Sequence, residues 1–421
     1  MRVRIITQLI LFTLIIGVNS CDTSGSVDPV YKQYFIKYYG EDGDQEGNDF
    51  VINPDGTIII LGTSTFGINK RIYLVKVDPE GNEIWKKTLG SQSNELAVDI
   101  EPITNGPDVD NFLVLSNVAK NDVDYDIRLT VINLNGDSLK STLFNQLQSQ
   151  EAKSVTPLTD GGYFVSGKTT DTDQTDGGNA GLPDPSSDVE DLLIIRFQSD
   201  FSFIPSDVYR IGGSYVGSAL KIFQEGNAFY YAGDSDEITK TNLPDNNTYE
   251  SNLFFRTFTE NPASVSSIYS GSLTLPEKMG AIARSPSGVF MAIGTRDNLT
   301  GTDKQLYGVT LTNNFKAIQT EDVIDDGGGQ REAVAVASSG ASRFLILANE
   351  FNAALNRDIY LRKTNVQLDK DFEVKFGAPN NDDTGNAVAE LPNGDILILG
   401  TMSLTNQRKI ALIKLRSNGQ F

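Results

Sequence analysis

The fold is decided by residues 391–401, LPNGDILILGT, which repeat residues 53–63, NPDGTIIILGT. In both stretches a turn with Asn or Asp before Gly leads into an apolar run, a pattern typical of a hairpin turn followed by a strand. The alignment continues outward at a constant offset, so that Gly47 corresponds to Gly385. A repeat of this kind is typical of solenoids and propellers.

From residue 47 onward the chain divides into seven units, each with four predicted strands. The first strands are predicted at residues 50–53, 97–103, 152–158, 219–223, 281–285, 333–337 and 387–391. The second strands are nearly continuous in apolar residues: TIIILGT, NFLVLSN, GYFVSGK, AFYYAGD, VFMAIGT, RFLILAN and DILILGT. Such runs are typical of strands that are buried on both faces.

The third strands recur as IYLVKVD, IRLTVIN, LLIIRFQ, LFFRTF, LYGVTLT, IYLRKTN and IALIKLR. More polar fourth strands are predicted at residues 84–89, 139–144, 208–211, 265–269, 317–323 and 372–376. This decline in apolar content predicts a radial blade whose outer strand is half exposed. The sequence therefore predicts an all-β fold, a seven-bladed β-propeller, with an open β-solenoid as the alternative.

The seventh unit ends at Phe421, where its fourth strand should begin. We predict that residues 31–39 supply this strand by pairing with residues 410–415, so that the last blade is closed by the N-terminal strand. Closure would remove an open sheet edge that promotes aggregation. The propeller is expected to span residues 30–421 as one domain, because a ring of blades grows without a thicker core.

The N-terminus has the pattern of an export signal. Arg2 and Arg4 precede an apolar run at residues 5–18, and small residues approach Cys21, the one cysteine of the chain. This pattern resembles a bacterial lipoprotein signal, which implies removal of residues 1–20 and acylation of Cys21 with lipid such as palmitate. An ordinary cleaved secretory signal is the alternative. The apolar run is shorter than the roughly 20 residues that span a bilayer, and residues 21–29 read as a flexible tether.

Charge and composition exclude several classes of function. The formal net charge of -20 argues against nucleic acid as a partner and against attachment to anionic lipid by charge alone. The chain contains no histidine, which removes Ser-His-Asp and Cys-His catalysis and histidine-ligated metal sites. Chemistry would have to come from carboxylates, hydroxyls, amides and Lys or Arg.

The connectors are of two kinds. Tight Asn/Asp-Gly turns join first to second strands, and often third to fourth strands, on one face of the ring. Longer loops and the acidic or Gly-rich blade connectors at residues 41–48, 325–332 and 379–385 should gather on the opposite face. Binding function tends to reside in such loop clusters on a rigid scaffold.

The longest of these loops, residues 169–189, contains a candidate metal site. Asp171, Asp173 and Asp176 precede a Gly-rich bend, an arrangement that loosely suits calcium. The alternative is a solvated loop that binds no metal.

Residues 78–85, DPEGNEIW, resemble the repeats of quinoprotein-type propellers. In that family a tryptophan recurs in each blade and docks the blades together. Trp85 is the one tryptophan here, and Val374 or Phe35 stands at the equivalent place elsewhere. The resemblance implies the fold and gives no reason to expect a pyrroloquinoline quinone cofactor. The whole chain also resembles exported propeller lipoproteins of Bacteroidota.

Two hypotheses of function follow from these patterns. The first is a monomeric, non-catalytic binding or scaffold lipoprotein, anchored to the outer membrane in the cell envelope, whose loop face engages a protein or a glycan. The second is a hydrolase or lyase that uses paired Asp and Glu side chains on glycans, since such pairs work without histidine. A purely structural role in the envelope is a third reading. The sequence assigns no catalytic or cofactor-binding residue.

Overall fold

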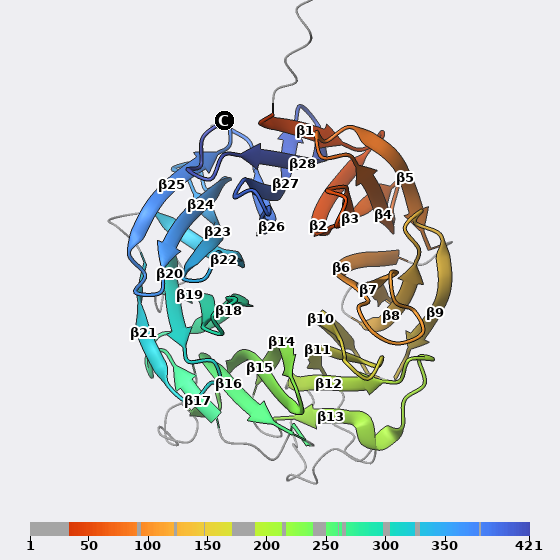
Figure 1. Ribbon diagram of the computed structural model, residues 1–421, viewed down its shortest axis with the longest axis vertical. Coiled ribbons are helices and arrows are strands. Elements are labelled where there is room, and N and C mark those ends of the chain that lie inside the picture. Colours follow the sequence, from red (N-terminus) through yellow and green to blue (C-terminus); the bar gives the residue numbers. More distant parts are fainter. Residues whose placement is uncertain are drawn as a thin grey trace, which may run out of the picture. The chain divides into compact units, whose positions relative to one another are not determined.

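The computed structural model describes residues 33–90, 94–121, 124–146, 148–170, 190–212, 216–238, 250–259, 261–262, 267–297, 304–324, 329–378 and 380–421. Residues Tyr34–Phe421 form one compact unit. Within the described ranges, its strands form seven four-stranded antiparallel sheets arranged around a ring, a seven-bladed β-propeller (Figure 1). The predicted fold class is confirmed.

Every blade has the same strand order from the centre outward. The innermost strands are β2 (Asp44–Ile52), β6 (Asn94–Pro102), β10 (Gln150–Pro157), β14 (Gly217–Glu225), β18 (Glu277–Arg284), β22 (Gln330–Ser339) and β26 (Thr384–Glu390). The second strands are β3 (Ile58–Phe66), β7 (Phe112–Ala119), β11 (Tyr163–Thr169), β15 (Ala228–Ser235), β19 (Phe290–Asp297), β23 (Arg343–Phe351) and β27 (Ile396–Leu404). Blades 1 to 7 are numbered in this order.

The outer half of each blade is equally regular. The third strands are β4 (Asn69–Val77), β8 (Tyr125–Ile132), β12 (Asp191–Phe197), β16 (Asn252–Phe258), β20 (Lys304–Leu311), β24 (Arg357–Asn365) and β28 (Gln407–Leu415). The outer strands are β5 (Glu83–Leu89), β9 (Ser138–Phe144), β13 (Val208–Ile211), β17 (Ser267–Ser270), β21 (Ile318–Val323), β25 (Lys370–Phe376) and β1 (Phe35–Tyr39). As predicted, the second and third strands are mostly buried, and outer strands such as β5 and β25 alternate between half-buried and exposed positions.

The ring is closed by the N-terminal strand. β1 pairs antiparallel with β28, from Phe35 opposite Lys414 to Tyr39 opposite Ile410 (Figure 1). The Tyr39 hydroxyl also donates a buried hydrogen bond of 2.7 Å to the backbone oxygen of Gly81 in blade 1. The predicted pairing is confirmed, with the strand itself limited to Phe35–Tyr39.

The innermost strands begin earlier than the sequence pattern suggests. Each contains a β-bulge, for example between Gly47 and Asp49 in β2 and between Gly385 and Ala387 in β26. A bulge adds one residue to the strand and breaks the alternation of inward and outward side chains. The alternating pattern that predicts a strand therefore does not extend across the bulge to the first half of the strand. Parts of the three predicted acidic connectors are therefore strand, which corrects that prediction.

The predicted turns and the contacts between blades explain the repeated glycines. Gly56 and Gly394 have φ of 82° and 86°, as a turn requires of glycine. The ring of Trp85 lies so close to Gly136 of blade 2 that a Cβ there would be 2.6 Å from it. In blade 6 the equivalent aromatic residue is Phe372, which meets Gly419 in the same way. The prediction of Val374 at this position is wrong, because Phe372 pairs with Lys363 just as Trp85 pairs with Lys76, and both outer strands have the same register shift.

A side-chain bond joins consecutive blades. Near the end of a second strand, one side chain accepts a hydrogen bond from the backbone N–H that precedes the bulge of the next blade. These bonds measure 2.8 to 3.2 Å and join Thr63 to Ala97, Asn117 to Ala152, Asp234 to Met279, Thr295 to Ala333, Asn349 to Gly385 and Thr401 to Gly47. The position, which we call the acceptor position, is the last residue of each predicted second-strand motif.

We predict that Thr401→Val lowers the free energy of unfolding by about 1 to 3 kcal/mol, because the buried N–H of Gly47 loses its acceptor at 3.0 Å. Thr88→Val, on the exposed surface of β5, should change it by less than about 0.5 kcal/mol. Urea unfolding of both variants measures the difference. Equal midpoints for the two variants would contradict the role assigned to the acceptor position.

Candidate functional site

The sevenfold repeat provides an internal comparison for each position. A residue that serves the fold should resemble its equivalents in the other blades. A residue that departs from them is a candidate for function. We therefore compared the positions around the bulge of each innermost strand.

The acceptor position departs from the pattern in blades 3 and 4. It holds Thr or Asn in five blades, but Lys168 in blade 3 and Asp234 in blade 4. An ammonium group can only donate, so Lys168 cannot make the bond that joins the other blades. It pairs instead with Glu190 at 2.6 Å and with Glu151 at 3.3 Å.

Two further cations depart from the pattern in the same sector. The residue inserted by the bulge is Lys153 in blade 3, where the other blades hold Asn, Val, Leu or Gly. The residue opposite the acceptor position is Lys278 in blade 5, where the others hold Glu, Leu, Ser or Thr. Lys153 pairs with Glu151, whereas Lys278 makes no hydrogen bond or ion pair in the part of the chain that the structure describes.

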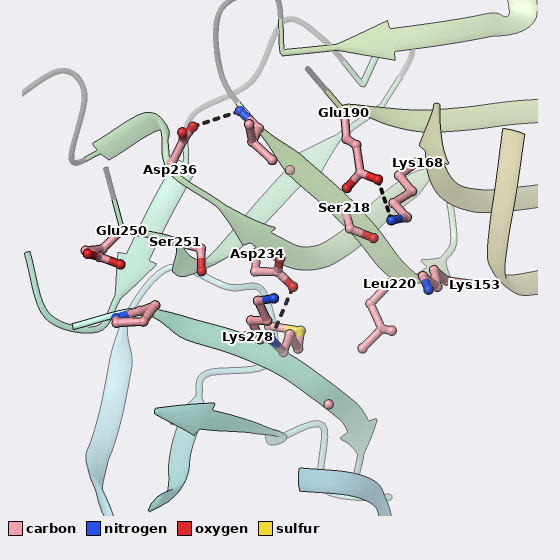
Figure 2. A pocket seen from close by; sticks show the side chains of 15 residues that line it. Lys153, Lys168, Glu190, Ser218, Leu220, Asp234, Asp236, Glu250, Ser251 and Lys278 are labelled. Carbon is pink, nitrogen blue, oxygen red and sulfur yellow. Dashed lines mark hydrogen bonds and ion pairs between the residues drawn. The ribbon is translucent and has the colours of Figure 1, made fainter. Parts of the chain in front are cut away.

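These four charged side chains line one cavity of about 670 Å³, which we call the side cavity. It opens at the end of blades 3 to 5 where second strands end and third strands begin, which is the predicted loop face. Figure 2 shows Lys168 paired with Glu190 and Asp234 near Lys278. The side cavity is also lined by Ser218, Leu220, Asp236, Glu250, Ser251 and Met279.

Asp234 has unusual acid–base properties. Burial raises its pKa to about 6, although the N–H of Met279 and the charges of Lys278, Lys153 and Lys168 act in the opposite direction. The three ammonium groups act through space, and the carboxylate accepts a hydrogen bond of 3.2 Å from the N–H of Met279. Asp234 is therefore an acid that can change its protonation state close to neutral pH.

A second cluster lies at the centre of the ring. A central cavity of about 260 Å³ is lined by bulge residues from all seven innermost strands. Lys221 of blade 4 reaches Asp99 at 3.4 Å and Glu101 at 2.5 Å, both in blade 2. These residues also depart from the repeat, because blades 5 to 7 hold alanine where Asp49, Asp99 and Lys221 stand.

The central carboxylates share a proton. Burial and the charge of Asp99 raise the pKa of Asp49 well above its usual range. Burial would also raise the pKa of Asp99, but Lys221 and the hydrogen bond from Asp49 bring it below the usual range. These directions favour a protonated Asp49 that donates a hydrogen bond to ionised Asp99. Asp49 and Asp99 also accept backbone N–H groups of the following blade, from Ile100 at 3.3 Å and Val155 at 2.9 Å.

The two cavities are neighbours, since Lys153, Leu220 and Gly280 line both. The site is thus one polar sector of the ring. It combines paired cations, one cation without a partner among the described residues, and carboxylates with opposite shifts in pKa. Such a sector can bind polar ligands and can also exchange protons with them.

The structure does not describe the candidate site residues predicted from the sequence. Cys21, Asp171, Asp173 and Asp176 are outside the described residues, so lipidation and calcium binding stay predictions. Among the residues that are described, no three acidic side chains come together as a metal site. Nor does this part of the chain contain a helix with the length and apolar character needed to cross a membrane.

Comparisons with known proteins support the fold alone. No model of a known protein family and no curated protein sequence matches this chain. The polysaccharide lyase Uly1 has a similar structure, with a TM-score of 0.52 and 8% identity over 90% of this chain and 91% of that one. The plexin A4 extracellular region has a TM-score of 0.50 and 9% identity, covering 88% of this chain and 50% of that one.

A third similar structure is the β-propeller domain of the Trilobed protease from Pyrococcus furiosus, with a TM-score of 0.49 and 10% identity. The match covers 88% of this chain and 95% of that one. At identities of 10% or less, these similarities concern the fold. The function has to be argued from the site.

We predict that Asp234→Asn stabilises the protein at pH 7 by about 1 to 2 kcal/mol, because a carboxyl whose pKa is raised to about 6 opposes folding when ionised. Asparagine can keep the bond to Met279, as Asn117 and Asn349 do at the equivalent position. The folded protein regains this stability as the pH falls from about 6 toward the usual pKa of about 4.

The stabilisation by Asp234→Asn should therefore shrink at pH 4.5. Urea unfolding of the variant and the parent protein at both pH values measures it. A difference in stability that is the same at pH 4.5 and pH 7 would show that Asp234 does not titrate in this range.

Proposed function

We propose that the protein is a lipid-anchored binding protein of the cell envelope that holds a glycan in the side cavity. The single observation that carries the proposal is the convergence of Lys153, Lys168, Asp234 and Lys278 on this cavity. Each differs in chemical type from the residues at the equivalent position in the other blades. Four unusual residues that line the same cavity are better explained by the binding of a ligand than by the stability of the propeller.

The size and lining of the side cavity favour a polar ligand. A volume of about 670 Å³ is in the range of small-molecule sites, roughly 300 to 1,000 Å³. Leu220, Val216, Pro276 and Met279 provide apolar surface, and Ser218 adds a hydroxyl group among the charged side chains. A hydroxyl-rich sugar can exchange hydrogen bonds with such a lining, whereas an apolar ligand would leave its polar groups unpaired.

The paired charges support a rigid binding site. Lys168 is held by Glu190 and Glu151, which fixes an ammonium group at the cavity wall. Asp236 accepts a hydrogen bond of 2.8 Å from the N–H of Val216, which fixes a second polar group. Groups that are ordered before binding lose less entropy when the ligand arrives, so they favour affinity.

A carboxylate enzyme is the second candidate. The proton shared by Asp49 and Asp99 favours it, because two carboxyls with separated pKa values can act as acid and base. Their bonds to Ile100 and Val155 support a structural role instead, since they tie blades 1 to 3 together. We therefore rank binding without catalysis first.

We predict that the purified protein binds members of a panel of neutral, uronate-containing and sulfated oligosaccharides. Fluorescence titration measures binding, and mass spectrometry of the recovered oligosaccharides measures cleavage. Recovery of intact ligand supports the binding role, whereas shortened or unsaturated products would favour the enzyme. A panel without any binding would overturn the proposal of a glycan-binding protein.

We predict that Cys21→Ser releases the protein from the membrane fraction, because a lipid on Cys21 is the anchor that we propose. The parent protein should sediment with membranes, and the variant should remain in the supernatant after the same fractionation. The matched control is Ser20→Ala, which keeps the cysteine and should still sediment. Sedimentation of Cys21→Ser with membranes stripped of other proteins would contradict the lipid anchor.

A further inference from the structure

We infer that the ligand of the side cavity carries a carboxylate, as in an oligosaccharide of uronic acids, and that this group is held between Lys278 and Asp234. The inference rests on the proposed function and narrows it to one chemical class. Its basis is an imbalance of charge at one end of the cavity.

Among the described residues that line the side cavity, Lys278 is the lysine without an ion pair or a side-chain hydrogen bond. The equivalent residues in three other blades are glutamates that pair with cations. Glu46 pairs with Arg408, Glu151 pairs with Lys153 and Lys168, and Glu332 pairs with Lys304. Lys278 reverses the sign at this position, and it forms no ion pair with the described residues. Lys278 is exposed at the cavity wall, so its ammonium group is available to form a charge-assisted hydrogen bond with an anionic group of a ligand.

Because of Asp234, a carboxylate of the ligand fits this end of the cavity better than a group that stays ionised at every pH, such as a sulfate. It faces Lys278 of β18, Lys153 of β10 and Lys168 of β11, with Glu190, Asp236 and Glu250 elsewhere in the lining. A second carboxylate placed beside Asp234 would repel it while both are ionised. Two carboxyls that share one proton avoid this repulsion, as Asp49 and Asp99 do in the same molecule.

Binding should therefore take up one proton. Protonated Asp234 would donate its O–H to one oxygen of the ligand carboxylate, and Lys278 would donate to the other. No covalent bond changes, and the proton comes from solvent. Because the pKa of Asp234 is raised to about 6, affinity should fall as the pH rises through this value. A sulfate group is a much weaker base than a carboxylate, so it would accept a weaker hydrogen bond from Asp234 and bind less tightly.

The test is calorimetric titration of the full-length protein with oligomers of galacturonate, glucuronate and mannuronate, at pH 5 and pH 7. The methyl esters of these oligomers and sulfated galactose oligomers serve as comparison ligands. Buffers with different heats of ionisation give the number of protons taken up. We expect binding of at least one uronate, weaker binding of its ester, and uptake of about one proton at pH 7.

Three variants locate the effect. Lys278→Gln should weaken uronate binding by roughly tenfold or more, since a charge-assisted hydrogen bond is lost. Lys316→Gln, in the same blade but in the exposed turn after β20, should bind as the parent protein does. Asp234→Asn should remove the proton uptake and the pH dependence. Unfolding of each variant in urea confirms that it is folded.

The outcomes separate this inference from the proposed function. Equal binding of ester and acid, or binding of neutral or sulfated sugars without any uronate, would overturn the inference and leave glycan binding intact. Unchanged affinity of Lys278→Gln for the uronate would also overturn it. Failure of all the oligosaccharides to bind would overturn the proposed function itself.

Discussion

The structure depends on one hydrogen bond that is repeated around the ring. Blades of a propeller are separate sheets, so no backbone ladder runs from one to the next, and their junctions depend on side chains. At six junctions an acceptor at the end of the second strand binds the N–H before the bulge of the next blade, as Thr63 does for Ala97. The bulge exposes that N–H, and the acceptor position satisfies it. The geometry thus demands an acceptor at one place in every blade.

The candidate site lies at the two blades whose acceptor position holds a residue other than Thr or Asn. Lys168 cannot accept, and Asp234 accepts with a charged group whose pKa is raised by burial. The space between these blades becomes a cavity with fixed charges, while Lys221 spans the centre to hold Asp99 and Glu101. A rigid ring tolerates such a local departure, because the other junctions and the pairing of β1 with β28 keep it closed.

The sequence predicts the fold well because each repeat carries the same local signals. Turn glycines such as Gly56, the apolar second strands and the missing strand after Phe421 led to the blades and to their closure by β1. Strand bounds failed at the bulges, where alternation breaks. The docking residue Phe372 is identified by the pairing of the outer strands, in which Phe372 lies opposite Lys363 as Trp85 lies opposite Lys76.

The site was missed for a different reason. In the sequence, acidic clusters such as that of residues 169–189 point to the long loops, whereas the second-strand motifs indicate repetition. Yet the last letters of those motifs, T, N, K, D, T, N and T, already show Lys168 and Asp234 as departures. What the sequence could not show is that Lys153 and Lys278 meet these residues at one cavity. That requires the bulges and the register of each blade.

The most direct test of the account is the reactivity of Lys278 in intact cells that express the protein. A small acetylating reagent and mass spectrometry give its rate of modification relative to exposed Lys316 in the same blade. If the side cavity holds the native ligand, this ratio should be several times lower in cells than in the purified protein. An equal ratio in the two samples would show that Lys278 is uncovered in the cell envelope, and the side cavity would then not be the binding site.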